Sequence, residues 1–173
     1  MKKSLSSWQY TGFIFTAIAG ILLHFAYNWS NQSPLLAPFA AVNESIWEHM
    51  KLLFFPMFVF ALIENHFWGS EYDNFWCVKL IGITLGLLLI PTLYYTYTGA
   101  FGIMLDFINI TIFFLTTAIV YSVETRIFES GHTCRISSRT AFIILCLIAF
   151  IFVVFTFFPP QIPLFEAPKT GRP

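Results

Sequence analysis

Five long apolar stretches restrict what this chain can fold into. A run of about 20 predominantly apolar residues crosses the hydrocarbon core of a bilayer as one α-helix. The five stretches run approximately through residues 10–27, 47–63, 75–97, 101–123 and 140–158. The sequence therefore predicts an all-α integral membrane bundle of five transmembrane helices. The connecting segments are short, so we expect one transmembrane domain over residues 1–173 and no separate soluble domain.

The composition agrees with a surface that faces lipid. Hydrophobic residues make up 57% of the chain and charged residues only 10%, whereas soluble domains average about 25% charged residues. The formal net charge is zero, and the nine basic residues never form a polybasic run. The chain therefore has no field that would attract nucleic acid, and we expect membrane lipid as its main surrounding partner.

The distribution of Lys and Arg predicts the orientation of the bundle, because cytoplasmic loops carry an excess of these residues. If the N-terminus lies inside, six of them fall on the cytoplasmic side: Lys2, Lys3, Lys79, Arg126, Arg135 and Arg139. Three then fall outside: Lys51, Lys169 and Arg172. This bias predicts an N-terminus inside and a C-terminus outside, with the first span as an uncleaved signal anchor.

Polar side chains from four of the predicted helices gather at one depth, near the outer leaflet. They end the first span, open the second, close the third and begin the fourth. These residues are His24, Asn43, Glu44, Glu48, His49, Tyr94, Tyr97, Asp106 and Asn109. An ionised side chain that faced lipid at this depth would be expensive, so we expect the group to face a shared pocket.

Histidines and a carboxylate from different helices could bind a divalent metal such as zinc in this pocket. We predict His24 and His49 as ligands, together with Asp106 or Glu48. Three protein ligands leave an open position, where a bound water ionises near neutral pH. The sequence contains neither H-E-x-x-H nor H-x-x-x-H. The alternative is therefore that His49 is only a hydrogen-bonding residue at a helix end.

The start of the second span also matches a capping box. In Ser45-Ile46-Trp47-Glu48, the serine hydroxyl accepts from one free amide and the glutamate from another. Glu48 and Lys51 are three residues apart and can form an ion pair. Capping explains Ser45 and Glu48 without any further function, but it leaves His49 unexplained.

Other polar residues have simpler interpretations. A short acidic turn in contact with water is predicted at Glu64–His66, Glu71 and Asp73. His132 is expected to lie in an ordinary loop. The cysteines Cys77, Cys134 and Cys146 are odd in number and show no C-x-x-C spacing. We therefore expect small side chains in or near helices, and neither a disulfide framework nor a thiolate zinc site.

The C-terminal residues 159–173 predict an extended tail, because the prolines in PPQIPLF prevent a helix. The apolar residues of this tail need cover. Two arrangements remain open from the sequence: the tail folds back over the outer end of the bundle, or it extends away without order.

Two motifs resemble a family of small bacterial multi-pass membrane proteins of unknown function. The first is VNESIWEH at Val42–His49, followed by a hydrophobic span with Pro56, and the second is PPQIPLF at Pro159–Phe165. In that family the tail commonly continues with Asp-Pro and Thr-Gly pairs. Here Ala167 stands at the aspartate position, whereas Thr170–Gly171 remains. The resemblance implies a location in the bacterial cytoplasmic membrane and supplies no activity.

Three functions remain open from the sequence, and whether the protein is an enzyme is undecided. The preferred one is a ligand-binding, sensor or assembly module with a homo-oligomeric or membrane-protein partner. The alternative is a membrane-embedded, metal-dependent hydrolase or transferase acting on a lipid or another amphiphile. Its catalytic groups would be His24, Glu48, His49 and Asp106, and its ligand would be held by Asn43, Glu44, Tyr94, Tyr97 and Asn109. The third is a structural protein whose polar residues only fix helix packing.

Overall fold

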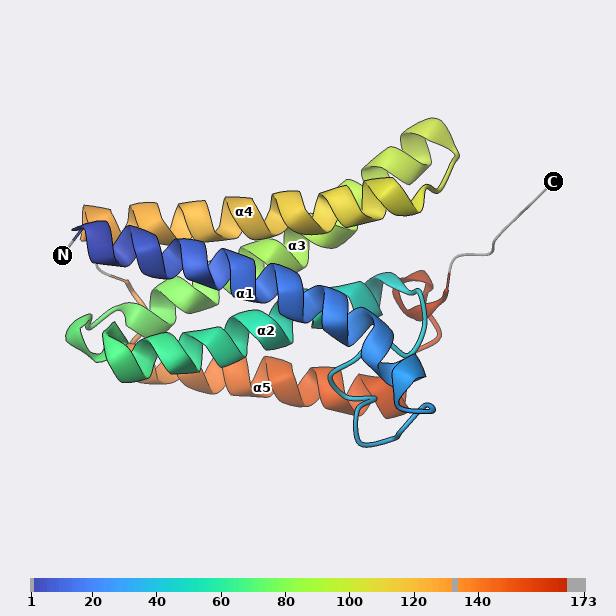
Figure 1. Cartoon of the computed structure of the whole chain (residues 1–173), viewed down its shortest axis with the longest axis horizontal. Helices are drawn as coiled ribbons and strands as arrows, with labels where there is room; N and C mark the ends of the chain where they lie inside the picture. Colours follow the sequence, from blue (N-terminus) through green and yellow to red (C-terminus); the bar gives the residue numbers. More distant parts are fainter. Residues whose placement is uncertain (1, 132–133, 168–173) are drawn as a thin grey trace.

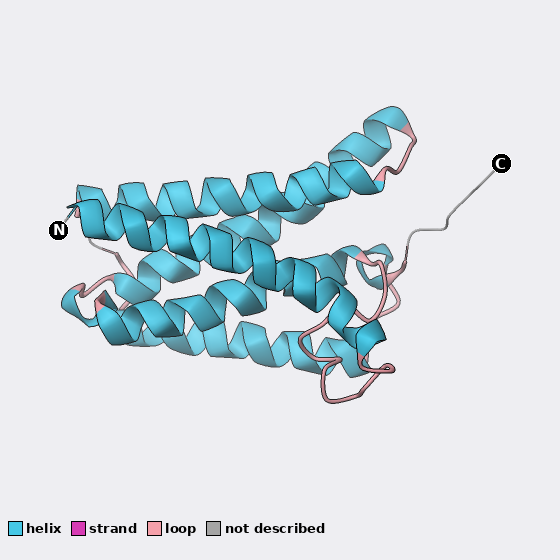
Figure 2. Ribbon diagram, in the orientation of Figure 1, coloured by secondary structure: helices cyan, strands magenta, loops and turns pink. Residues whose placement is uncertain are grey.

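The computed structural model describes residues 2–131 and 134–167, and within these residues the chain is helical with no strand (Figures 1 and 2). The five long helices are α1 (Lys2–Trp29), α2 (Ile46–Phe67), α3 (Phe75–Phe101), α4 (Asp106–Ser130) and α5 (Ser138–Phe157). Two single 3-10 turns, η1 (Gly69–Glu71) and η2 (Pro163–Phe165), complete the fold. All five helices are long and apolar enough to cross a membrane, which confirms the predicted fold class.

Local sequence signals set four of the helix ends. Ser45 and Ser137 are the N-caps of α2 and α5, and each hydroxyl accepts from the amide three residues later. Gly102 and Gly131 end α3 and α4 in the left-handed conformation, with φ of 63° at both, which glycine adopts without steric cost. The predicted capping role of Ser45 is therefore confirmed.

The helices pack as a bundle in which α2 is the most enclosed. Helices α1, α2, α3 and α4 contact one another in a ring, and α5 packs on α3 and α2 (Figure 1). Glycines allow the closest approaches: Gly86 of α3 faces Leu53 of α2 and Val120 of α4. Gly82, one turn earlier on α3, packs against the Glu124 side chain of α4, so the two glycines bring α3 close to two neighbouring helices.

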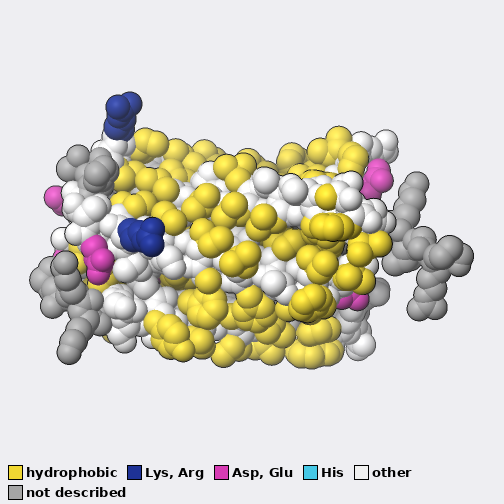
Figure 3. Space-filling view, turned by 90° about the horizontal axis from the view of Figure 1, so that it is seen from above, with side chains coloured by type: hydrophobic (Ala, Val, Ile, Leu, Met, Phe, Trp, Pro, Cys, Tyr) yellow, Lys and Arg dark blue, Asp and Glu magenta, His cyan; other side chains and the backbone are white. Residues whose placement is uncertain are grey.

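The outer surface is apolar around the middle of the bundle. Large side chains such as Leu88, Phe107 and Phe150 are exposed on it. Figure 3 shows hydrophobic atoms covering the middle of one face, with the charged side chains confined to its two ends. Soluble monomers rarely expose a continuous apolar area of this extent, and lipid is the surrounding that such a surface suits.

The two ends of the bundle differ in character. One end, which we call the His pole, holds the end of α1, the start of α2, the α3–α4 turn and η2 (Figure 1). The other, which we call the disulfide pole, holds the start of α1, the α2–α3 connection and the α4–α5 connection. The described N- and C-terminal residues lie at opposite poles, as an odd number of spans requires.

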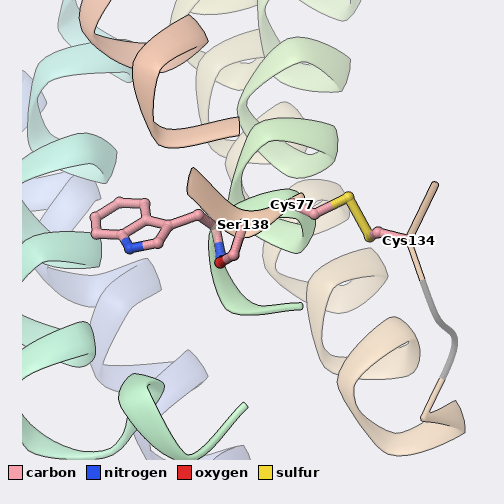
Figure 4. The surroundings of a disulfide bond; sticks show 4 residues. Cys77, Cys134 and Ser138 are labelled. Carbon is pink, nitrogen blue, oxygen red and sulfur yellow. A yellow bond between two sulfur atoms is a disulfide. The ribbon is translucent and has the colours of Figure 1, made fainter. Parts of the chain in front are cut away.

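A disulfide joins Cys77 of α3 to Cys134 of the α4–α5 connection, with a Cα–Cα distance of 6.3 Å (Figure 4). The prediction that the cysteines form no disulfide is therefore wrong. The two residues are 57 positions apart and meet only because α3 packs beside α4 and α5. Beside the bridge, the hydroxyl of Ser138 accepts from the Trp76 amide, which ties the start of α5 to α3.

The described part of the tail folds back onto the bundle. The ring centroid of Phe165 in η2 lies 4.5 Å from that of Trp47 in α2 and 5.7 Å from that of Phe155 in α5. Of the two arrangements left open by the sequence, the folded-back tail is the one observed at these residues. His132 and the tail from Pro168 onward, with Thr170–Gly171, lie outside the described residues.

Candidate metal centre

A return of the chain at the His pole brings His24, Glu44 and His49 together. His24 lies near the end of α1, and His49 lies in the first turn of α2. The connection between these helices turns back at Asn31 and Gln32, which both have positive φ. It then runs along α1, where the Ala41 amide donates to the Leu23 carbonyl at 3.4 Å. Glu44 consequently arrives beside His24 just before α2 begins.

Glu44 faces both imidazoles, one with each carboxylate oxygen. Its Oε1 lies 3.8 Å from His24 Nε2, and its Oε2 lies 3.7 Å from His49 Nε2. One ligand atom from each residue can be chosen so that all three lie within 4.8 Å of one another. A tetrahedral zinc site with bonds of about 2.1 Å separates its ligand atoms by about 3.4 Å. A contraction of roughly 1 Å would therefore close the three residues around an ion.

The backbone sets the tautomer of His49. Its Nδ1 lies 2.8 Å from the Ser45 carbonyl oxygen, which can only accept, so the neutral ring carries its proton on Nδ1. The lone pair is then on Nε2, the atom that faces Glu44. Metal-ligating histidines are commonly oriented in this way, with the second ring nitrogen donating to a carbonyl or carboxylate.

The site is open to water on one side. The side chains of His24 and His49 are 28% and 21% exposed, whereas that of Glu44 is 67% exposed. An ion can therefore reach the imidazoles, and the exposed Glu44 carboxylate has room to rotate onto it. Two imidazoles and one carboxylate leave a fourth position free for water or another ligand.

A model of a family of unknown function matches the chain over residues 1–173. The chain belongs to that family, DUF6512. No curated protein and no solved structure matches the chain. The predicted resemblance to a family of unknown function is thus confirmed over the whole chain. The description of DUF6512 states no activity, so the site's chemistry rests on the geometry of this member.

Two other predicted catalytic residues do not join the three in this DUF6512 chain. Asp106 is exposed at the start of α4 and is not a member of the cluster. Glu48 is buried, and its Oε2 lies 2.7 Å from Lys51 Nζ and accepts from the Val42 amide at 2.8 Å. The predicted Glu48–Lys51 pair is confirmed. Both contacts use Glu48 Oε2, and the carboxylate lies outside the cluster of His24, Glu44 and His49.

The predicted ligand-binding residues have separate partners. Tyr97 donates its hydroxyl proton to Asn109 Oδ1 at 2.6 Å, which joins α3 to α4. Tyr94 donates to Met104 and lines a pocket next to η2 that shares no residue with the metal cluster. Asn43 accepts from the Ser45 amide at 2.8 Å and so shapes the entry to α2. The single pocket that the sequence predicts is therefore divided, and Glu44 is the one residue of this group that faces the histidines.

Sequence reasoning missed a buried ion cluster near the disulfide pole, made by Gln9, Glu64, Lys79 and Glu124. Lys79 Nζ lies 2.5 Å from Glu64 Oε2 and 2.6 Å from Glu124 Oε2, and Gln9 Nε2 donates to Glu64 Oε1 at 3.0 Å. The prediction that Glu64 belongs to a turn in contact with water is wrong, because it is fully buried. Lys79 and Lys51, which the Lys and Arg count treats as loop residues, are buried as well.

A signal for this cluster exists in the sequence. Lys79 stands four residues inside an apolar span, and Glu124 directly follows another. Ionisable residues inside spans face the bundle interior and pair with one another. The pairing itself needs three helices to be placed side by side, which the sequence alone does not supply.

Proposed function

We propose that this protein is an integral protein of a bacterial cytoplasmic membrane that binds a divalent transition metal ion through His24, Glu44 and His49. Zinc is the best chemical match, because imidazole and carboxylate ligands with one open position suit it. The observation that carries the proposal is the convergence of two Nε2 atoms on one carboxylate, with the His49 tautomer set by the Ser45 carbonyl.

Metal binding would have a structural consequence at the His pole. The three ligands belong to the end of α1, to the connection that follows it and to the first turn of α2. An ion held by all three fixes the α1–α2 connection against both helices. This supports a ligand-binding or sensor module in which occupancy of the site changes the order of an exposed connection.

A metal-dependent hydrolase or transferase acting on an amphiphile is the second candidate. The open fourth position favours it, because a metal-bound water there could attack a lipid headgroup. The buried pair of Glu48 and Lys51 counts against it, since the nearest carboxylate in α2 is already neutralised. We therefore place metal binding before catalysis.

Elemental mass spectrometry of detergent-purified protein tests the proposal. The protein is purified without chelator, incubated with excess zinc alone and desalted before its metal content is measured. We expect one zinc per chain in the wild type and loss of zinc in both His24→Ala and His49→Ala. His66→Ala is the matched control, because His66 is an exposed histidine at the opposite end of α2 and its removal should leave the zinc content unchanged.

Two results would overturn the proposal. One is folded wild-type protein that retains no zinc after this incubation. The other is zinc that remains in both His24→Ala and His49→Ala, which would place the ion at another site. Circular dichroism on each variant confirms that the helices are intact, so loss of zinc is not confused with loss of fold.

A further inference from the structure

The buried ion cluster of Gln9, Glu64, Lys79 and Glu124 joins four helices, and each of its side chains is at most 3% exposed. Glu64 comes from α2, Lys79 from α3, Glu124 from α4 and Gln9 from α1. The cluster contains two carboxylates and one ammonium group. If all three groups were ionised, it would carry one net negative charge without contact with water.

A second buried ion pair in the same chain has equal numbers of acidic and basic groups and serves for comparison. At the other end of the bundle, Glu48 and Lys51 form a buried pair of one acid and one base. That pair needs no further charge. Burying an uncompensated charge costs several kcal/mol, so the cluster with the extra carboxylate requires a positive charge from elsewhere.

The cluster also has too few hydrogen-bond donors for its acceptors. Glu124 Oε1 and Gln9 Oε1 are buried acceptors for which residues 2–131 and 134–167 provide no donor. Lys79 already directs its ammonium group at Glu64 Oε2 and Glu124 Oε2. A proton on one carboxyl group would remove the excess charge and also convert one acceptor into a donor.

A proton fits this place better than an alkali metal ion. Gly82 packs directly against the Glu124 side chain, so that even a methyl group at Gly82 would overlap it. An alkali ion also needs several oxygen ligands and would lie beside the Lys79 ammonium group, which repels it.

The surroundings keep Lys79 charged, so the additional proton belongs to the carboxyl groups. The rings of Phe75, Tyr121 and Phe128 have their centroids 5.5–5.8 Å from Lys79 Nζ, within the range of a cation–π interaction. Tyr121 is the other titratable group that faces the cluster, and its hydroxyl is hydrogen-bonded to Thr16 at 2.9 Å.

We propose that Glu64, Lys79 and Glu124 form a proton-binding site in which the two carboxyl groups share one exchangeable proton. Glu64 is three residues from the end of α2, and Lys79 is four residues from the start of α3. At about 1.5 Å per residue, the site lies roughly 4.5–6 Å inside the disulfide pole, which is therefore the nearer end of the bundle for proton exchange. This proposal is independent of the metal site at the His pole.

Infrared difference spectroscopy tests the proposal, because a neutral carboxylic acid has a carbonyl stretch separate from that of a carboxylate. We expect this acid band in the folded wild type at neutral pH, and we expect it to shift in heavy water because the proton exchanges. Both Glu64→Gln and Glu124→Gln should abolish the band. Either variant leaves one carboxylate opposite one ammonium group, which is the balanced arrangement seen for Glu48 and Lys51.

Glu48→Gln is the matched control, because it removes a buried carboxylate from a balanced pair and should leave the band in place. Wild-type protein without an acid band at neutral pH would overturn the proposal without any variant. So would a band that survives in both glutamine variants, or one that does not shift in heavy water. A band present in choline buffer but absent in sodium buffer would assign the site to sodium and overturn it as well.

Discussion

The stability of the bundle should depend strongly on Lys79. Replacement by methionine keeps the unbranched apolar part of the side chain but removes the ammonium group that lies 2.5 Å and 2.6 Å from two buried carboxylates. Breaking one buried ion pair by removing one partner costs about 3–5 kcal/mol. Because Lys79 serves two carboxylates, we expect Lys79→Met to lower the free energy of unfolding by at least about 3 kcal/mol, a large part of the roughly 5–15 kcal/mol that is typical.

The assay is reversible unfolding by SDS in mixed micelles, followed by circular dichroism. The triple variant Lys79→Met, Glu64→Gln and Glu124→Gln replaces all three ionisable groups by neutral groups of similar shape, and should recover most of the lost stability. Arg139→Met is the matched control, since it removes an exposed cation from α5 and should change little. The reasoning is refuted if Lys79→Met is no less stable than Arg139→Met, or if the triple variant is less stable than Lys79→Met alone.

Three further predictions concern the metal site, helix packing and orientation. Zinc should raise the thermal unfolding temperature of the wild type but not that of His49→Ala, as measured by a thermal shift assay with a dye that does not react with thiols. An equal rise in His49→Ala would contradict specific binding. Gly86→Ala should destabilise the protein by about 1–3 kcal/mol in the SDS assay, because its new methyl group would lie 2.5 Å from Leu53 Cδ2. Gly99→Ala is the control and should not destabilise the protein, because no described atom lies within 4 Å of the added methyl group. Equal stabilities of the two variants would argue against close packing at Gly86. Disulfides persist in oxidising compartments, yet the Lys and Arg bias predicts the disulfide pole inside. Because the structure contains the bridge, we expect maleimide added before cell lysis to label neither Cys77 nor Cys134, which would place the disulfide pole on the oxidising side and reverse the predicted orientation. Free thiols at both cysteines in cells would contradict this expectation and support the orientation predicted from Lys and Arg.

The sequence alone determined the features that depend on neighbouring residues or on total hydrophobicity. Five apolar stretches predict five long helices, because each stretch matches the length that a bilayer requires. Capping at Ser45 and the Glu48–Lys51 pair also follow from the sequence, since residues three apart at a helix start must meet. His24 and His49 were identifiable as candidates because the end of one predicted span and the start of the next must lie on the same side of the membrane.

The tertiary structure decided which distant side chains share a site. Glu44 rather than Asp106 faces the two histidines because the α1–α2 connection turns back along α1, and no residue spacing encodes that path. The contact of Cys77 with Cys134 and the pairing of Lys79 with two glutamates likewise need three helices packed in one order. Hydropathy predicts that each helix is long enough to cross a bilayer but not which helices are neighbours. Packing against those neighbours turns isolated polar residues into a metal centre at one pole and a buried ion cluster near the other.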